Sequence, residues 1–332
     1  MAKLLAKILD QQKLTLTGVV GDALTYFQGC QLPDGSVAED PETLIFQEWD
    51  SVNALKAISV WRSAVPLDDG GWAERVVGFL RSREKASGML SWGVLETGPA
   101  EYCTETSSEY ISALTLLGRQ AEAGAKAAFL RSRQLPSGPW EEVHTQIPKA
   151  FQTEPSVTGF ALMALLGLDI DPLYLDQALD FLARIQKSEG HFGINWYYYN
   201  SHYYLIRPAV AALASYGHHA AVGAARDFTL ADQRDDGSWY SEVDGFGEYS
   251  SPEQHTALAL GVLASADMDA NEPAVRRGVT WLLGRRRSDG SWHGGRYPYP
   301  DTSTYRDFHA AQDVFTTSQV LLALNQLAAL EA

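Results

Sequence analysis

One turn recurs along the whole chain, and this repeat constrains the fold more than any other feature. Its glycines are Gly35, Gly88, Gly138, Gly190, Gly237 and Gly290, spaced 47 to 53 residues apart. An aromatic residue stands nine positions before each glycine, a long polar residue four before, and an apolar residue two after. Agreement at so many positions indicates that the chain consists of six copies of one structural unit.

Each unit is expected to contain two helices joined by this turn. Segments before the turn, such as 120–133 and 173–186, place apolar residues at helical spacing. Segments after it are nearly apolar all round and predict buried helices. These second helices are expected at 49–61, 107–118, 156–167, 204–217, 252–265 and 315–327. Six such hairpins close most economically into a ring, so we predict an all-α (α/α)6 toroid over residues 1–332, a single domain.

The repeated turn is interpreted as a structural device. Its glycine permits the backbone reversal that ends the first helix. The polar residue is most often glutamine, whose side chain can tie one helix end to the next. Catalytic residues are therefore sought elsewhere.

Composition excludes several classes of function. The net charge of −15 argues against electrostatic binding to nucleic acid. Two cysteines without a CxxC spacing argue against a disulfide framework or a Cys-rich zinc site. Residues 1–14 predict an amphipathic helix that packs on the domain or rests on a membrane surface. We expect a cytoplasmic monomer, with peripheral membrane contact as an alternative for substrate uptake.

The aromatic–x4–Gln–x3–Gly–x–Trp pattern resembles the QW motif of class II terpene cyclases, the squalene–hopene and oxidosqualene cyclases. Residues 190–213 resemble that family's Gly-x-Trp-Gly-x-Asn-Tyr segment, and 235–260 its Asp-Gly-x-Trp-Gly-Glu segment. The likeness covers nearly the whole chain, but the repeats suffice for only one toroid. It therefore implies the single-domain type, similar to merosterolic acid synthase, which folds a prenylated dihydroxybenzoate into fused rings.

This resemblance implies a metal-independent enzyme that protonates a linear polyprenyl chain and needs no cofactor. The family's Asp-x-Asp-Asp acid motif is absent, and the corresponding position reads CTETSSEYISAL, with Glu105 and Glu109. We expect Glu109 to be the proton donor, because burial raises the pKa of a carboxyl and keeps its proton in place. Glu105 and Asp50 are the alternatives, and Asp313 comes after them.

Electron-rich walls are the second requirement of such chemistry, because an aromatic face stabilises a cation without reacting with it. Aromatic residues gather where the second helices are expected to begin. The residues assigned to substrate binding on this ground are Trp49, Tyr110, Phe151, Phe160, Trp196, Tyr197, Tyr203, Tyr204, Tyr305, Phe308 and Phe315.

A residue for the head group and a terminating base complete the candidate site. Arg207 is expected to meet an anionic head group, and His255 or one of Tyr203 and Tyr204 to serve as the terminating base. No metal site is predicted. Two other functions stay open, namely a six-hairpin glycoside hydrolase or lyase and a non-catalytic isoprenoid-binding toroid.

Overall fold

The computed structural model describes residues 3–39, 46–91, 101–143, 157–193, 201–240, 251–268, 272–298 and 309–330. The outer helices are α2 (Leu16–Gly29), α4 (Trp72–Arg83), α6 (Gln120–Ser132), α8 (Leu175–Ile185), α10 (His219–Ala231) and α12 (Pro273–Gly284). The inner helices are α3 (Gln47–Ser59), α5 (Thr104–Leu116), α7 (Thr158–Leu166), α9 (His202–Ser215), α11 (Pro252–Ser265) and α13 (Asp313–Ala329). Strands β1 (Arg296–Pro298) and β2 (His309–Ala311) pair antiparallel, with Tyr297 opposite Ala310.

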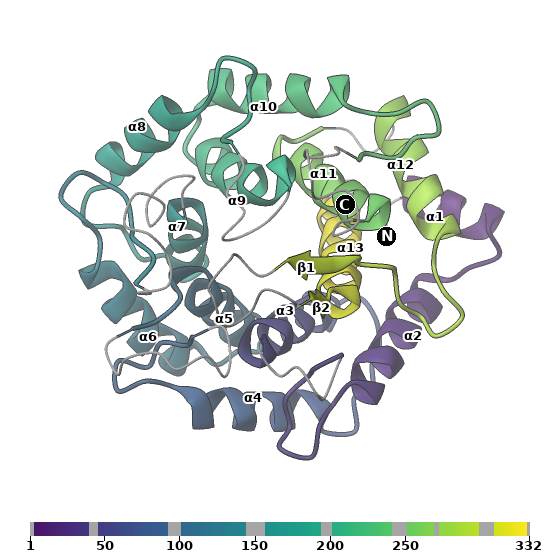
Figure 1. Cartoon of the computed structure of the whole chain (residues 1–332), viewed down its shortest axis with the longest axis horizontal. Helices are drawn as coiled ribbons and strands as arrows, with labels where there is room; N and C mark the ends of the chain where they lie inside the picture. Colours follow the sequence, from purple (N-terminus) through teal and green to yellow (C-terminus); the bar gives the residue numbers. More distant parts are fainter. Residues whose placement is uncertain are drawn as a thin grey trace.

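Two concentric layers of helices form a closed ring, as Figure 1 shows. The inner helices contact one another in cyclic order, and α13 packs against α3 to close the circle. Nearly every residue of α3 and α11 is buried, whereas an outer helix such as α4 buries only one face. The predicted (α/α)6 toroid is confirmed.

The repeated turn performs the structural role predicted from its sequence. Gln134 Nε2 donates to the carbonyl of Gly138 at 2.8 Å and to that of Tyr174, just before the next outer helix, at 3.0 Å. Gln31, Gln186 and Gln233 make the same pair of bonds in their own repeats. Each glutamine therefore links consecutive units of the outer layer.

The aromatic residue after the turn glycine joins the two layers. Trp140 is almost fully buried, and its indole Nε1 donates to the carbonyl of Leu130 on α6 at 2.8 Å. Its backbone N–H donates to Thr158 Oγ1 at the start of α7. Trp239 and Trp292 repeat both contacts in their units. The turn thus fixes where each inner helix begins.

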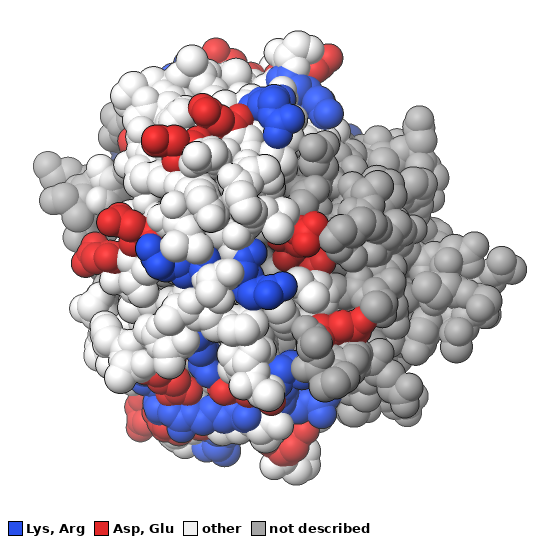
Figure 2. All heavy atoms as spheres, turned by 90° about the vertical axis from the view of Figure 1, so that its left-hand side faces the viewer, with Lys and Arg blue, Asp and Glu red and all other residues white. Residues whose placement is uncertain are grey.

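The N-terminal helix α1 (Lys3–Gln11) lies against α12 and α13, and buries Leu5, Ile8 and Leu9 there. No helix within the described ranges is long and apolar enough to cross a membrane. Figure 2 shows basic and acidic side chains interspersed over the face formed by α6 and α8. Several of them pair between neighbouring outer helices, as Arg81 does with Glu122 at 2.5 Å.

Gly138 tests whether the turn requires glycine. Its φ is 108°, and an added Cβ would lie 2.3 Å from the backbone of Gln177 on α8. We expect Gly138→Ala to lower the free energy of unfolding, measured by urea denaturation, by about 2 kcal/mol or more. Gly217 is the control, because its φ is 79° but nothing lies within 4 Å of an added Cβ. Equal losses in the two variants would show that the close approach to α8 is unimportant.

Candidate active site

Four aromatic side chains and one buried carboxyl group gather at the N-terminal ends of the inner helices, and two of the rings contact the carboxyl. Glu105 is 3% exposed, and the rings around it belong to four further inner helices. Trp49 stacks on Phe315 at 4.3 Å, Phe315 meets the Tyr204 ring edge-on at 5.7 Å, and Tyr204 lies 5.7 Å from Phe160. We call these five residues the aromatic box.

The Glu105 carboxyl receives two hydrogen bonds on the same oxygen. Trp49 Nε1 donates to Oε1 at 2.6 Å, and the Tyr204 hydroxyl donates to Oε1 as well. No residue in the described ranges hydrogen-bonds Oε2. Burial raises the pKa of Glu105 from 4.5 to about 7, although the two donors lower it, and the nearby Glu109 raises it further. Glu105 therefore holds a proton near neutral pH, and Oε2 is the oxygen available to carry it.

The start of α5 places Glu105 in the box. The sequence prediction began this helix at residue 107, but it begins at Thr104. Cys103 caps it by accepting the Thr106 N–H on its sulfur at 3.3 Å, and Glu142 Oε1 accepts the Thr104 N–H at 2.8 Å. Cysteine is not a usual cap residue, and the second cap comes from another repeat. Because these contacts start α5 at Thr104, Glu105 lies in the first turn of this helix.

A polar layer lies one helical turn deeper than the box. It consists of Asn53, Lys56, Glu109, Arg207 and Gln319, which follow the box residues by three to seven positions on α3, α5, α9 and α13. These side chains, together with Phe160 and Tyr204, line a cavity of about 90 Å³. Such a cavity holds a few water molecules. The centre of the ring is therefore aromatic at its N-terminal end and polar below.

Glu109, the expected proton donor, lies in this polar layer. Its Oε2 forms an ion pair with Lys56 Nζ, and 14% of the Glu109 side chain is exposed. An ion pair stabilises the ionised carboxylate. This geometry suits a charged structural group better than a group that gives up a proton.

Asp50 is a buried residue of α3 that lies near Glu39. Burial raises its pKa well above the usual value, and the neighbouring Glu39 adds to this effect. Among the described residues, none hydrogen-bonds Asp50 Oδ1. Glu39 accepts the N–H of Val314 at the start of α13. Burial therefore favours the protonated form of Asp50, while the preceding residue, Trp49, donates to Glu105.

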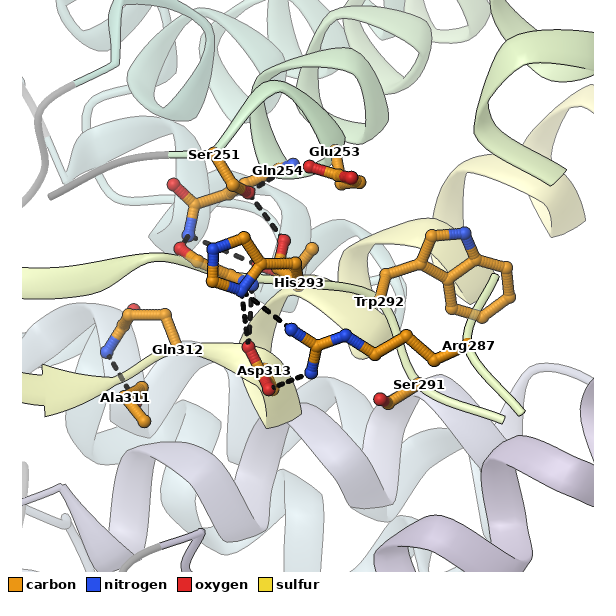
Figure 3. A network of polar contacts seen from close by, with 12 residues as sticks. Ser251, Glu253, Gln254, Arg287, Ser291, Trp292, His293, Ala311, Gln312 and Asp313 are labelled. Atoms are coloured by element: carbon orange, nitrogen blue, oxygen red, sulfur yellow. Dashed lines mark hydrogen bonds and ion pairs between the residues drawn. The ribbon is translucent and has the colours of Figure 1, made fainter. Parts of the chain in front are cut away.

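Figure 3 shows the contacts of Asp313 with Arg287 and His293, which favour its carboxylate form. Burial opposes its ionisation, but hydrogen bonds from His293 and the Gly294 N–H, together with the Arg287 charge, lower its pKa. Arg287 Nη1 lies 2.5 Å from Asp313 Oδ2. Asp313 stabilises the start of α13, and its carboxylate form does not fit the role of proton donor.

Three of the predicted binding residues point away from the box. The Tyr110 hydroxyl donates to Glu84 at 3.2 Å, and the Tyr203 hydroxyl donates to Asp232 at 2.7 Å. His255 is buried, with its ring centroid 6.1 Å from that of Tyr203. Burial lowers the pKa of His255 to about 3, so it is neutral.

Five further residues assigned to substrate binding lie outside the described residues. They are Phe151, Trp196, Tyr197, Tyr305 and Phe308. Within the described ranges, no group of three His, Cys, Asp or Glu side chains is arranged to hold a metal ion.

The family profile of the squalene-hopene cyclase C-terminal domain matches residues 152–329. The chain belongs to this family. It is 30% identical to a squalene–hopene cyclase of Zymomonas mobilis over 42% of this chain and 23% of that protein. It is also 31% identical to a copalyl diphosphate synthase of Streptomyces anulatus over 43% of this chain and 26% of that protein. The chain thus spans about a quarter of the curated relatives that it matches.

A solved structure matches the fold over its whole length. This is a variant of the type II terpene cyclase MstE from Scytonema in complex with geranylgeranyl dihydroxybenzoate. The TM-score is 0.70 at 18% identity, covering 98% of this cyclase-family chain and 99% of the other. The one-toroid architecture therefore occurs in another chain of this kind.

Sequence reasoning missed the members of the polar layer other than Glu109 and Arg207. Asn53 and Lys56 stand four and seven residues after Trp49, and Gln319 stands four after Phe315. Polar residues at this spacing in otherwise apolar helices share a face with the aromatic residue. That signal was present in the sequence.

Protonated buried carboxyls make the stability depend on pH. Burial raises the pKa of Glu142 from 4.5 to about 8, so the folded chain keeps a proton that the unfolded chain releases between these values. The free energy of unfolding should therefore fall as the pH rises through this window. We expect Glu142→Gln to flatten this slope by about 1.4 kcal/mol per pH unit, measured by urea unfolding. Parallel curves for the two proteins would contradict the assignment.

Proposed function

We propose that this chain is a class II terpene cyclase that protonates a linear polyprenyl chain and folds it into fused rings. The observation that carries the proposal is the aromatic box, in which a buried, protonated carboxyl lies among four aromatic side chains. Protonation of an alkene needs a carboxylic acid that stays neutral until it reacts. The cation that forms needs neighbours that stabilise it and do not trap it.

Glu105 is the proposed acid. Its O–H bond breaks as the terminal alkene takes the proton, and the bonding pair stays on the carboxyl group. Trp49 and Tyr204 already donate to Oε1, so both stabilise the carboxylate that results. These donors are in place before the reaction and need no rearrangement.

The aromatic side chains of the box provide the walls for the cation. A desolvated cation over an aromatic face gains about 2 kcal/mol. Phe160, Phe315 and Trp49 come from three different inner helices, so they present faces from several directions. They also exclude water, which would end the reaction early.

The substrate is assigned to the side of the box that faces away from the polar layer. The cavity below the box, about 90 Å³, is far smaller than the roughly 300–1,000 Å³ of typical small-molecule sites. A polyprenyl chain therefore approaches from the N-terminal ends of the inner helices. By similarity to the complex of MstE, we propose a prenylated aromatic acid such as geranylgeranyl dihydroxybenzoate as the substrate.

Removing the acid tests this function directly. We expect Glu105→Gln to lower the rate of cyclisation of geranylgeranyl dihydroxybenzoate without added metal by about 10²–10⁴-fold. Glu109→Gln is the matched comparison, and it should lower the rate far less than Glu105→Gln, because it removes a charge in the polar layer and leaves the acid in place. Product is measured by mass spectrometry. An active Glu105→Gln and an inactive Glu109→Gln would move the acid to Glu109; binding without turnover by the unmodified protein would support an isoprenoid-binding toroid instead.

The dependence of the rate on pH provides a second test. The acid must be protonated, so kcat should fall as the pH rises through about 7, the pKa of Glu105. Tyr204→Phe removes a hydrogen bond that favours the carboxylate. We expect this variant to move the fall in kcat to higher pH and to lower the plateau about tenfold. A profile that does not change would mean that Tyr204 does not act on the acid.

A further inference from the structure

A chain of hydrogen bonds crosses the centre of the ring directly below the aromatic box. Arg207 Nη1 on α9 donates to Gln319 Oε1 on α13. Gln319 Nε2 donates to Asn53 Oδ1 on α3 at 3.1 Å, and Asn53 Nδ2 donates to the Trp49 carbonyl at 2.9 Å. We call Arg207, Gln319 and Asn53 the Arg207 network. The network ends at the backbone carbonyl of Trp49, and the indole of Trp49 donates to Glu105.

The guanidinium of Arg207 forms no ion pair with a carboxylate in the described part of the chain, although the charge of Glu109 acts on it. Its one hydrogen bond there goes to the neutral side chain of Gln319. Lys56 pairs with Glu109, so the two cations and one carboxylate leave the lining of the cavity with one net positive charge. Burial lowers the pKa of Arg207, although a guanidinium stays charged. A buried cation without a counter-ion costs free energy, so its placement needs a reason.

The charged and titratable groups around Glu105 come from several elements. Cys103 and Glu109 lie on its own helix or cap, and Glu142 lies beside the start of that helix. Lys56 approaches from α3 and is paired with Glu109. Tyr204 and Arg207 approach from α9, three residues apart on one face. Lys56, Arg207 and Glu109 together leave one net positive charge in this set.

We infer that the Arg207 network is a second support for the acid, and that Arg207 is a positioning residue with an electrostatic role. Gln319 and Asn53 hold Trp49 against Glu105, and the guanidinium stabilises the carboxylate that remains after proton transfer. The inference rests on the proposed function. When the O–H bond of Glu105 breaks, the alkene π pair forms the new C–H bond, and the carboxyl keeps a negative charge. The net positive charge below the box then has a counter-ion.

Two substitutions of Arg207 separate its charge from its hydrogen bond. Arg207→Lys keeps a positive charge, whereas Arg207→Gln keeps a donor for Gln319 but is neutral. We expect Arg207→Gln to raise the apparent pKa in the kcat profile by about one unit and to lower kcat about tenfold. Arg207→Lys should keep a pKa near that of the unmodified protein. Arg276→Gln on the exposed face of α12 is the control and should change neither.

A merely structural role predicts a different result. Both Arg207 variants would then lose activity or thermal stability alike, with no movement of the pKa, and the inference would be overturned. Glu105 is also titrated without substrate by NMR of protein carrying 13C-labelled glutamate, with the signal assigned by its loss in Glu105→Gln. A raised pKa in Arg207→Gln supports the inference even if no cyclised product is found. An unchanged pKa there contradicts it, whatever becomes of the proposed function.

Discussion

The proposed site depends on two hydrogen-bond donors that converge on one oxygen of a buried carboxyl. Trp49 comes from the first inner helix and Tyr204 from the fourth, so this contact spans the ring. The contact forms only when the inner helices begin at the right heights. Those heights are set by the repeated turns, whose tryptophans and glutamines join each outer helix to its inner partner and to the next unit. The geometry around Glu105 therefore depends on the contacts of the repeated turns in the outer layer.

Two layers of different polarity follow from a single helical turn. A box residue and the residue three or four positions later lie on the same face, about 5.4 Å apart along the helix. On α9 this gives Tyr204 and then Arg207, and on α13 it gives Phe315 and then Gln319. The aromatic layer excludes water around the acid, and the polar layer supplies charge and hydrogen bonds from below. Neither layer fulfils both requirements alone.

The ring could be predicted from the sequence because its helices and turns follow from local sequence patterns. Helical periodicity and the turn glycines placed five of the six inner helices within two residues of their starts. The start of α5 was predicted less accurately, because it depends on Glu142, which comes from the next repeat. The sequence alone led us to expect Glu109 and not Glu105 as the proton donor, since the ion pair of Glu109 with Lys56 joins residues 53 positions apart. Contacts between segments far apart in the sequence cannot be predicted from local sequence patterns.

The central claim is that Glu105 is a neutral carboxylic acid in the folded protein near neutral pH. Infrared difference spectroscopy between the unmodified protein and Glu105→Gln measures this directly, through the C=O stretch of a protonated carboxyl. We expect a band at pH about 6 that is present only in the unmodified protein and disappears as the pH rises past about 7. A carboxylate signal in place of that band at pH about 6 would contradict the account.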